Sequence, residues 1–322
     1  YYQKTRPSSI SISDFSFPVR QIPYQNTKRF LYDAIKLKLG IKPKREEYRS
    51  FFSELTTSDI VVNLLGICFC ANLRRGRGER IKSAFPFLSS LFSIKQFPIS
   101  FVAKLFGIKS VKTPASYGPI KDRFDQMSAR FSANYIFDVM YAREKESQKQ
   151  MKEIARVKKN IKVAPDLANF WIPTYKYTAK GNTIGISVSH QIIRQWNSTE
   201  SYLDCIVNLI RHIEANTTCQ MMLIPNEIPI LNRYNDMHVA HDIVKKLSNS
   251  ERIQVLDVSS ITSTELKENI ARLDVMVASR YHSCVAALSS GVPVLVIGWH
   301  NKYEELLELY GQERWIISCE NC

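Results

Sequence analysis

A strand, a turn and a helix follow one another between Asp274 and Leu288, and this unit constrains the fold most. Asp274–Val277 is apolar and β-branched, which predicts a buried strand, and Cys284–Leu288 predicts an apolar helix. Arg280 and His282 lie between them, where the strand ends and the helix begins. In an open α/β sheet that turn is the place where ligands bind.

An anion is the ligand that this turn favours. The free N–H groups in the first turn of the helix add partial positive charge at the strand end. Lys302 follows a second predicted strand over Val294–Ile297, so a lysine joins Arg280 at the same edge of the sheet. These groups predict a site for a small, multiply charged anion, while the residues alone leave open that Arg280 is an ordinary solvated turn residue.

Strands and helices alternate along most of the chain, which predicts βαβ units and parallel sheets. The predicted strands that precede this turn cover residues 59–65, 109–113, 136–140, 161–164, 183–188, 221–224 and 253–256. Pro173–Gly181 predicts a linker. We therefore expect an α/β protein with two Rossmann-like domains, residues 1–172 and 173–322, that face each other across a cleft.

The charge of the chain indicates anionic partners. Lys and Arg number 44 against 30 Asp and Glu, a formal net charge of +14, which favours phosphorylated substrates, anionic lipid or nucleic acid. A non-catalytic nucleic-acid-binding protein is one alternative, although no recognisable nucleic-acid module supports it.

Prolines and lysines interrupt the apolar segment Phe85–Ile108, so it predicts core helices, with peripheral contact to an anionic membrane as the alternative.

The cysteines and the ends of the chain bear on its environment. Seven scattered cysteines do not form a disulfide framework, so we expect reduced thiols and a cytoplasmic protein, at most peripheral at the inner face of the membrane. No cluster of ligands at metal-binding spacing predicts a metal site. The chain starts at Tyr1 without methionine and ends at Cys322, so we expect a fragment with a truncated N-terminus. No oligomeric state follows from the sequence.

Several separated motifs resemble those of the polysaccharide pyruvyl transferase family. They are Ser279–His282, Ala287–Pro293, Gly298–Lys302, Ala142–Ser147 with Pro165 and Asp166 downstream, Ser116–Pro119, and Asn235 with Asp236 before a helix. Two features depart from the family. The Gly-rich turn after the first strand is reduced to Asn63–Gly66 with a single glycine, and the family's N-terminal strand is absent. Both departures concern the side of the cleft that would bind the acceptor.

The resemblance implies a fold similar to the GT-B glycosyltransferases, with the acceptor on the N-terminal domain and the donor on the C-terminal domain. It implies transfer of pyruvate from phosphoenolpyruvate to two hydroxyls of one sugar in a cell-surface glycan, as a cyclic ketal, with release of phosphate. The partners would be phosphoenolpyruvate and a free or lipid-linked glycan, with no cofactor and no nucleic acid. A GT-B glycosyltransferase that uses a nucleotide-sugar is the alternative.

The implied chemistry assigns roles to five residues. Phosphoenolpyruvate carries a carboxylate and a phosphate, and Arg143 and Arg280 are expected to grip them from the two halves of the chain. Lys302 and the backbone amide of Ser283 are expected to hold the phosphate. His282 is the predicted general acid that protonates the methylene carbon, with a capping or core role as the alternative.

Three further residues are weaker candidates. Glu227 is a candidate for the base that activates a sugar hydroxyl, although an ordinary surface glutamate is the alternative. His190 and His300 are expected on loops near the cleft, without assigned roles. For Arg143 the sequence also leaves open a local ion pair with Glu144.

Overall fold

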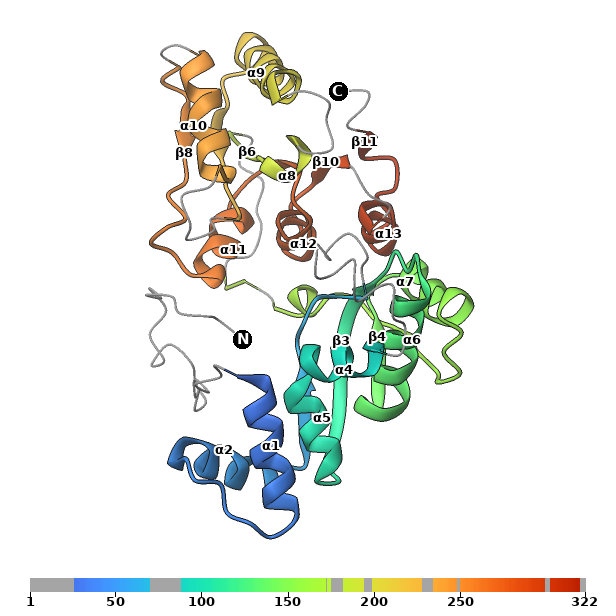
Figure 1. Ribbon diagram of the computed structural model, residues 1–322. Helices are drawn as coiled ribbons and strands as arrows, with labels where there is room; N and C mark the ends of the chain where they lie inside the picture. The colour runs from blue at the N-terminus through green and yellow to red at the C-terminus, as the bar shows by residue number, and fades with distance from the viewer. Residues whose placement is uncertain are drawn as a thin grey trace. The chain divides into compact units, whose positions relative to one another are not determined.

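The computed structural model describes residues 26–69, 88–171, 173–174, 182–193, 199–227, 234–247, 250–298 and 302–318 (Figure 1). The chain divides into two compact units, and the division falls between Leu167 and Ala168, whereas the sequence placed the boundary between residues 172 and 173. Most of the linker predicted over Pro173–Gly181 lies outside the described residues. Each unit contains a parallel sheet of its own.

The N-terminal unit is built on a parallel sheet. Its strands, in the order β1-β3-β4-β5, are β1 Ile60–Asn63, β3 Lys109–Tyr117, β4 Val139–Ala142 and β5 Lys162–Val163, and β2 Ile67–Cys68 pairs with the carboxyl end of β3. Its helices are α1 Thr27–Lys38, α2 Glu46–Thr56, α4 Ser89–Gln96, α5 Pro98–Leu105, α6 Arg123–Phe131 and α7 Lys145–Lys149. The π-helical turns Ser132–Ile136 and Gln150–Ile154 extend α6 and α7, and a 3-10 turn covers Leu167–Asn169.

Two apolar clusters hold the N-terminal unit together. One packs the buried side chains of β3 and β4 against α6 and the two π-helical turns, with Tyr117, Met140 and Met151 among its members. The other joins α1, α2 and α5, and it includes Phe30 and Phe52. Because α1 and α2 share this second cluster with α5, they are anchored to the unit through that helix.

The C-terminal unit has a sheet of parallel strands in the order β11-β10-β9-β6-β7-β8. The strands are β6 Thr183–Ser187, β7 Gln220–Leu223, β8 Ile253–Val255, β9 Val275–Ala278, β10 Val294–Gly298 and β11 Ile316–Ser318. The helices are α8 His190–Ile193, α9 Thr199–Asn216, α10 Asp236–Leu247, α11 Ser263–Ala271, α12 Tyr281–Ser289 and α13 Lys302–Leu309. This order is that of a Rossmann fold.

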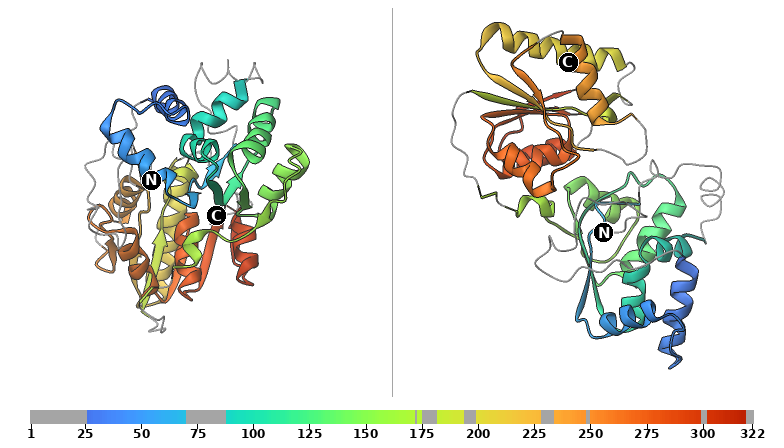
Figure 2. Two further views of the ribbon diagram at one scale, coloured as in Figure 1. Left: turned by 90° about the horizontal axis from the view of Figure 1, so that it is seen from below. Right: turned by 90° about the vertical axis from the view of Figure 1, so that its left-hand side faces the viewer.

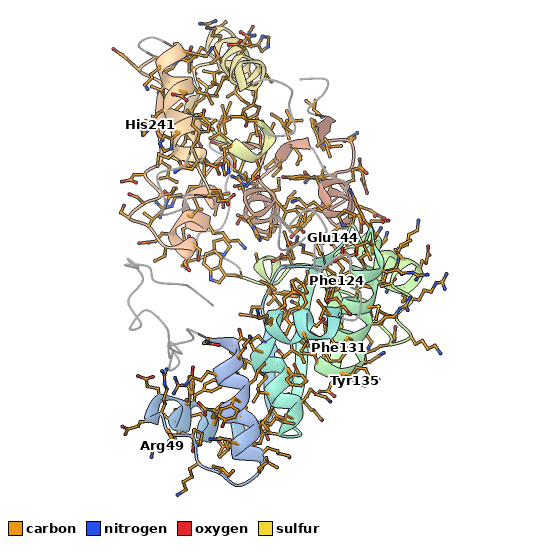
Figure 3. All side chains as sticks on the ribbon, viewed as in Figure 1. Arg49, Phe124, Phe131, Tyr135, Glu144 and His241 are labelled. Atoms are coloured by element: carbon orange, nitrogen blue, oxygen red, sulfur yellow. The ribbon has the colours of Figure 1, made fainter. Side chains whose placement is uncertain are left out.

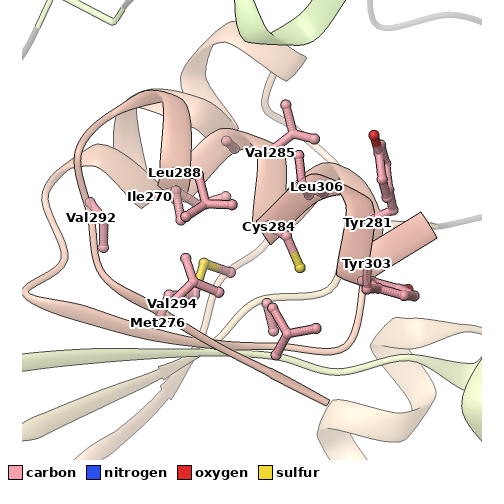
Figure 4. Close-up of a cluster of buried hydrophobic side chains, with 14 of the residues drawn as sticks. Ile270, Met276, Tyr281, Cys284, Val285, Leu288, Val292, Val294, Tyr303 and Leu306 are labelled. Atoms are coloured by element: carbon pink, nitrogen blue, oxygen red, sulfur yellow. The ribbon is translucent and has the colours of Figure 1, made fainter. Parts of the chain in front are cut away.

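Helices cover both faces of the second sheet (Figure 2). Successive side chains of a strand point to opposite faces, and β9 shows the consequence. Met276 and Ala278 pack with α11, α12 and α13 in the cluster of Figure 4, whereas Val277 packs with α9 and α10 on the other face. A strand that is buried on both faces reads as a continuous apolar run, which is why Asp274–Val277 predicted a strand.

The alternation of strands and helices confirms the predicted α/β class with two Rossmann-like units. Their arrangement across a cleft stays a prediction. Several boundaries differ from the sequence prediction. Helix α12 begins at Tyr281 rather than Cys284, and β4 begins at Val139 because Ile136 belongs to a π-helical turn. Helix α2 and strand β11 were not predicted.

Two expectations about the environment of the chain have different outcomes. Cys205 is disulfide-bonded, so the expectation of reduced thiols is wrong for that residue, whereas Cys68, Cys219 and Cys284 carry reduced thiols as expected. The described part of Phe85–Ile108 forms α4 and α5, and Phe97 and Val102 are buried, which confirms core helices. Within the described ranges, no helix is long and apolar enough to cross a membrane.

Candidate functional site

The strand order of the C-terminal unit brings the predicted site residues to one edge of the sheet. From the central β6 the chain builds outward through β7 and β8 on one side and through β9, β10 and β11 on the other. Ligands of open parallel sheets bind at the carboxyl ends of the strands that flank such a reversal. His190 follows β6, Arg280 follows β9 and Lys302 follows β10, so all three lie at that edge.

Arg280 is the centre of a hydrogen-bonded group at the reversal. Its Nε donates to Asp236 Oδ2 at 2.8 Å and its Nη2 donates to Asp236 Oδ1 at 2.5 Å, a bidentate pair. Its Nη1 lies 2.7 Å from Glu227 Oε2. The two carboxylates differ in exposure, because the Asp236 side chain is 0% exposed and the Glu227 side chain is 49% exposed.

Asp236 fixes the loops around this arginine. Its carboxylate accepts hydrogen bonds from the backbone N–H groups of His190, Asn226 and Glu227 at 2.9, 3.2 and 2.9 Å. Burial alone would raise the pKa of Asp236, but hydrogen bonds from His190 and Arg280 outweigh burial and lower the pKa to about 2. Burial likewise opposes the charge on Arg280, but the Asp236 carboxylate raises the pKa of the guanidinium. The pair is therefore ionised at neutral pH.

His190 supports this ion pair. It is the first residue of the short helix α8, whereas the sequence predicted a loop, and its side chain is buried. Its Nδ1 lies 2.9 Å from both Asp236 Oδ1 and Arg280 Nη2. Depending on the tautomer, Nδ1 either donates a hydrogen bond to the carboxylate or accepts one from the guanidinium, so in both tautomers the ring holds the pair in place.

Ser283 uses its side chain inside the fold. Its Oγ accepts hydrogen bonds from Ser187 Oγ at 2.9 Å and from Asn226 Nδ2 at 2.8 Å. The first hydrogen bond of α12 runs from the N–H of Cys284 to the carbonyl of Arg280. The three N–H groups before Cys284 therefore have no partner within the helix and point toward the strand end. They include the Ser283 amide that was predicted to hold phosphate.

Tyr281 is the common neighbour of the two remaining candidates. The His282 ring packs edge-on against it, with centroids 5.6 Å apart, and the side chain of His282 is exposed. The ammonium of Lys302 lies 5.5 Å from the Tyr281 ring centroid and 5.4 Å from that of Tyr303. His282 and Lys302 thus lie beside the N-terminus of α12, and the exposure of His282 excludes a core role.

Arg143 belongs to a separate cluster at the carboxyl ends of β3 and β4 in the N-terminal unit. Its Nε donates to Glu144 Oε1 at 2.8 Å, its Nη1 to Asp166 Oδ2 at 2.6 Å and its Nη2 to Ser116 Oγ at 2.6 Å. The Arg143 side chain is only 4% exposed. The local ion pair with Glu144 that the sequence left open is therefore present, and a grip on phosphoenolpyruvate stays a prediction.

Glu144 joins the elements of this cluster. It accepts hydrogen bonds from the hydroxyls of Ser116 and Ser147 at 2.5 and 2.6 Å, and the Ser147 hydroxyl accepts one from the N–H of Tyr117. Burial would raise the pKa of Glu144, but the charge of Arg143 and these hydrogen bonds lower it below the ordinary value. Figure 3 labels Glu144 at this edge of the N-terminal unit.

Sequence reasoning missed the role of one carboxylate, that of Asp236. Asp236 was noted only as a motif residue before a helix, yet it is the principal partner of Arg280. The feature of the sequence that could have revealed this role is a carboxylate at the start of a helix that follows a predicted strand. Glu227 lies beside Arg280 as an exposed partner, and His300 lies outside the described residues. Within the described ranges, no group of three or more His, Cys, Asp or Glu side chains could hold a metal ion.

Comparisons with solved structures return distant likenesses. A putative UDP-N-acetylglucosamine 2-epimerase from Listeria monocytogenes is 13% identical, with a TM-score of 0.47, over 86% of this chain and 71% of that chain. The S. aureus MnaA-UDP structure is 14% identical, with a TM-score of 0.48, over the same shares of the two chains. Likenesses at this level carry no argument about the site. No curated protein matches the chain by sequence.

The family comparison is more extensive. The family model for polysaccharide pyruvyl transferase matches residues 13–301, which is nearly the whole chain. The matched range contains Arg143, Arg280 and His282 and ends just before Lys302. The chain therefore belongs to the polysaccharide pyruvyl transferase family.

Proposed function

We propose that this protein transfers pyruvate from phosphoenolpyruvate to two hydroxyls of one sugar in a glycan, forming a cyclic ketal and releasing phosphate. The observation that carries the proposal is the edge of the C-terminal sheet at the reversal between β6 and β9. An ionised arginine, the N-terminus of helix α12 and a lysine share that edge with an exposed histidine. Such a set suits a ligand with both a carboxylate and a phosphate.

The two partners of Arg280 indicate how the donor would bind. Asp236 is buried and accepts five hydrogen bonds from backbone and guanidinium donors, so it stays in place. Glu227 is exposed and contacts only the Nη1 side of the guanidinium. The carboxylate of phosphoenolpyruvate would displace Glu227 from Nη1 while Asp236 keeps the guanidinium plane oriented. The phosphate would lie between the N-terminus of α12 and Lys302.

The chemistry then requires one proton donor and one proton acceptor. His282 would protonate the methylene carbon of phosphoenolpyruvate, which leaves an oxocarbenium-like centre at the neighbouring carbon. A sugar hydroxyl attacks that carbon and loses its proton, and the bond from the carbon to the phosphate oxygen breaks. A second hydroxyl attacks to close the ketal, and its proton leaves with the phosphate. These steps balance without a cofactor.

Glu227 is the proposed acceptor for the proton of the first hydroxyl. Its Oε2 contacts Arg280 Nη1 and also accepts a hydrogen bond from Gln191 Nε2 at 3.4 Å, and displacement by the donor would remove the contact with Arg280. Binding of phosphoenolpyruvate would thus prepare the base. His190 holds the Asp236–Arg280 pair. Arg143 is proposed as a second contact for the donor, and its hydrogen bonds to Glu144, Asp166 and Ser116 hold its guanidinium in place.

Calorimetry with phosphoenolpyruvate, and phosphate release in the presence of free and lipid-linked glycans, test the proposal. We expect saturable binding to the parent and an affinity at least about tenfold lower in Arg280→Lys, which keeps the charge but loses the guanidinium fork. Glu227→Gln should bind phosphoenolpyruvate more tightly than the parent and turn it over more slowly. Arg211→Gln, which changes an exposed arginine on α9, is the matched control.

The two variants separate the proposed roles. If Arg280→Lys keeps the parent's affinity, Arg280 is not the donor contact. Saturable binding of a nucleotide-sugar, with no binding of phosphoenolpyruvate, would replace the proposal with the glycosyltransferase alternative. Thermal unfolding of each variant shows whether a loss of binding reflects a loss of folding.

A further inference from the structure

The solvent face of helix α1 is apolar along its centre. Tyr32, Ile35 and Leu39 follow the spacing of one helix face, and they are 56%, 49% and 72% exposed. Ile41, just beyond the helix, is 51% exposed and continues the same apolar stripe. An ordinary surface helix presents a polar face to water, so this arrangement is the reverse of the usual one.

The stripe is not the face by which α1 packs. Phe30 and Ala34 lie on the other side of the helix and are fully buried among residues of α2 and α5. Phe30 stacks on Phe52 of α2 with ring centroids 5.3 Å apart. Figure 1 shows α1 beside α2, and Figure 3 labels Arg49 on the latter. The buried face anchors α1 to the N-terminal unit, and the apolar stripe stays exposed, where a partner could contact it.

The segment that carries the stripe is rich in basic residues. Residues 28–49 contain eight basic residues, namely Lys28, Arg29, Lys36, Lys38, Lys42, Lys44, Arg45 and Arg49. The same range contains the acidic residues Asp33, Glu46 and Glu47, so its formal charge is 8 − 3 = +5, and Asp33 is buried. The ammonium of Lys36 lies 4.5 Å from the Tyr32 ring centroid, so positive charge directly borders the apolar surface.

We infer that α1 and the loop after it, residues 28–45, bind the surface of an anionic lipid bilayer. Aliphatic and aromatic side chains would enter the headgroup region while the flanking lysines stay with the anionic headgroups. A protein partner fits less well, because lysine is depleted at the centres of protein interfaces. A nucleic acid would be held by cations and stacked aromatics and has no use for Ile35 and Leu39.

This surface replaces the membrane contact that the sequence left open for Phe85–Ile108. In the described part of that segment, Phe97, Val102 and Ile108 are buried in the core, and Leu91 is the one large apolar side chain that is mostly exposed. The inference does not depend on the proposed pyruvyl transfer, because α1 carries none of the residues assigned to the donor. Vesicle binding and phosphoenolpyruvate binding can therefore succeed or fail separately.

Sedimentation of the full chain with vesicles tests the inference. One set of vesicles contains phosphatidylcholine with phosphatidylglycerol, and the other contains phosphatidylcholine alone. We expect binding to the anionic vesicles only. The triple variant Tyr32→Gln/Ile35→Gln/Leu39→Gln should partition at least about tenfold more weakly. Lys36→Gln/Lys38→Gln/Lys42→Gln should lose about fivefold for each lysine removed, and added salt should weaken the parent in the same way.

Matched controls remove the same groups elsewhere. Leu91→Gln/Ile154→Gln/Leu309→Gln changes three side chains that are 62%, 40% and 55% exposed, and it should bind vesicles like the parent. Thermal unfolding should be unchanged in every variant, because none of the substituted side chains lies in a buried cluster.

Three results would overturn the inference. In the first, the parent does not bind anionic vesicles. In the second, the stripe variant Tyr32→Gln/Ile35→Gln/Leu39→Gln binds them as tightly as the parent, which would leave charge alone as the cause of binding. In the third, the parent is a dimer that the stripe variant converts to a monomer, and the stripe is then an interface between copies of this chain.

Discussion

Replacing Asp236 with asparagine should destabilise the C-terminal unit by a predictable amount. The pKa of Asp236 falls from its ordinary value of 3.8 to about 2 in the folded protein. At about 1.36 kcal/mol per pH unit, this difference corresponds to roughly 2–3 kcal/mol in favour of the ionised carboxyl. Asparagine is neutral and cannot accept bidentately from Arg280, so Asp236→Asn should lower the free energy of unfolding by about that amount at pH 7.

Urea unfolding followed by circular dichroism measures the loss. Urea is suited because it does not screen charge, and a chain with two units is expected to unfold in more than one step. The transition of the C-terminal unit should shift, and that of the N-terminal unit should not. Asp242→Asn changes a partly exposed carboxylate on the same helix, which accepts a hydrogen bond from the Tyr234 hydroxyl, and should cost less than about 1 kcal/mol.

The pH dependence distinguishes charge from packing. Because folding depresses the pKa of Asp236, the stabilisation is fully present above the ordinary pKa near 3.8 and is lost as pH falls toward about 2. The parent and Asp236→Asn should therefore differ by roughly 2–3 kcal/mol at pH 7 and converge between about pH 4 and pH 2. A difference that stays constant over this range, or no difference at pH 7, would refute the reasoning.

Two further predictions concern residues that would contact the donor. His282→Gln should keep the fold and much of the affinity for phosphoenolpyruvate, while turnover falls by roughly 10²–10⁴, the scale for a lost general acid; near-normal turnover in a steady-state assay would remove His282 from the mechanism. Lys302→Ala should weaken phosphoenolpyruvate binding by about 1.5–3 kcal/mol in calorimetry, and Lys302→Met, which keeps the stem over the Tyr281 and Tyr303 rings, should show the same loss if the charge is responsible.

The sequence predicted most strands of the C-terminal unit because they are buried on both faces and read as continuous apolar runs. It placed the start of α12 too late. Tyr281, His282 and Ser283 do not continue the apolar pattern, yet they form the first turn of the helix. It also missed α2, although Tyr48, Phe52 and Leu55 have helical spacing and are buried. The first fifty residues are basic and rich in polar side chains, and that composition obscured the pattern.

The site was predictable only in part, for a physical reason. The turn after β9 brings Arg280 and His282 together through local sequence, so both were found. Asp236 is 44 residues away from Arg280, and only the parallel pairing of β6 with its two neighbours brings them together. Charge pairing across such a distance depends on which strand ends meet, and the order of strands in a sheet does not follow from hydrophobic pattern.

Three buried serines narrow the choice of reactive groups at this edge. Ser187 and Ser283 share a hydrogen bond, and Ser279 accepts one from the buried hydroxyl of Tyr202 at 3.2 Å. The serine hydroxyls are therefore hydrogen-bonded inside the fold. Burial raises the pKa of Tyr202 to about 12, so neither its hydroxyl nor those of the serines suits proton transfer. Small side chains at these positions let α12 begin close to the sheet, with its N–H groups above it.

Among the described residues, four groups lie on the exposed side of this edge. They are the Nη1 side of Arg280, the first N–H groups of α12, the ammonium of Lys302 and the ring of His282. Three of the four are cationic or partly positive, which suits binding of an anion, and His282 alone among them has a side chain of the type that serves as a general acid or base. A donor held by the first three would therefore receive its proton from His282, and the His282→Gln variant tests the step on which the proposed reaction depends.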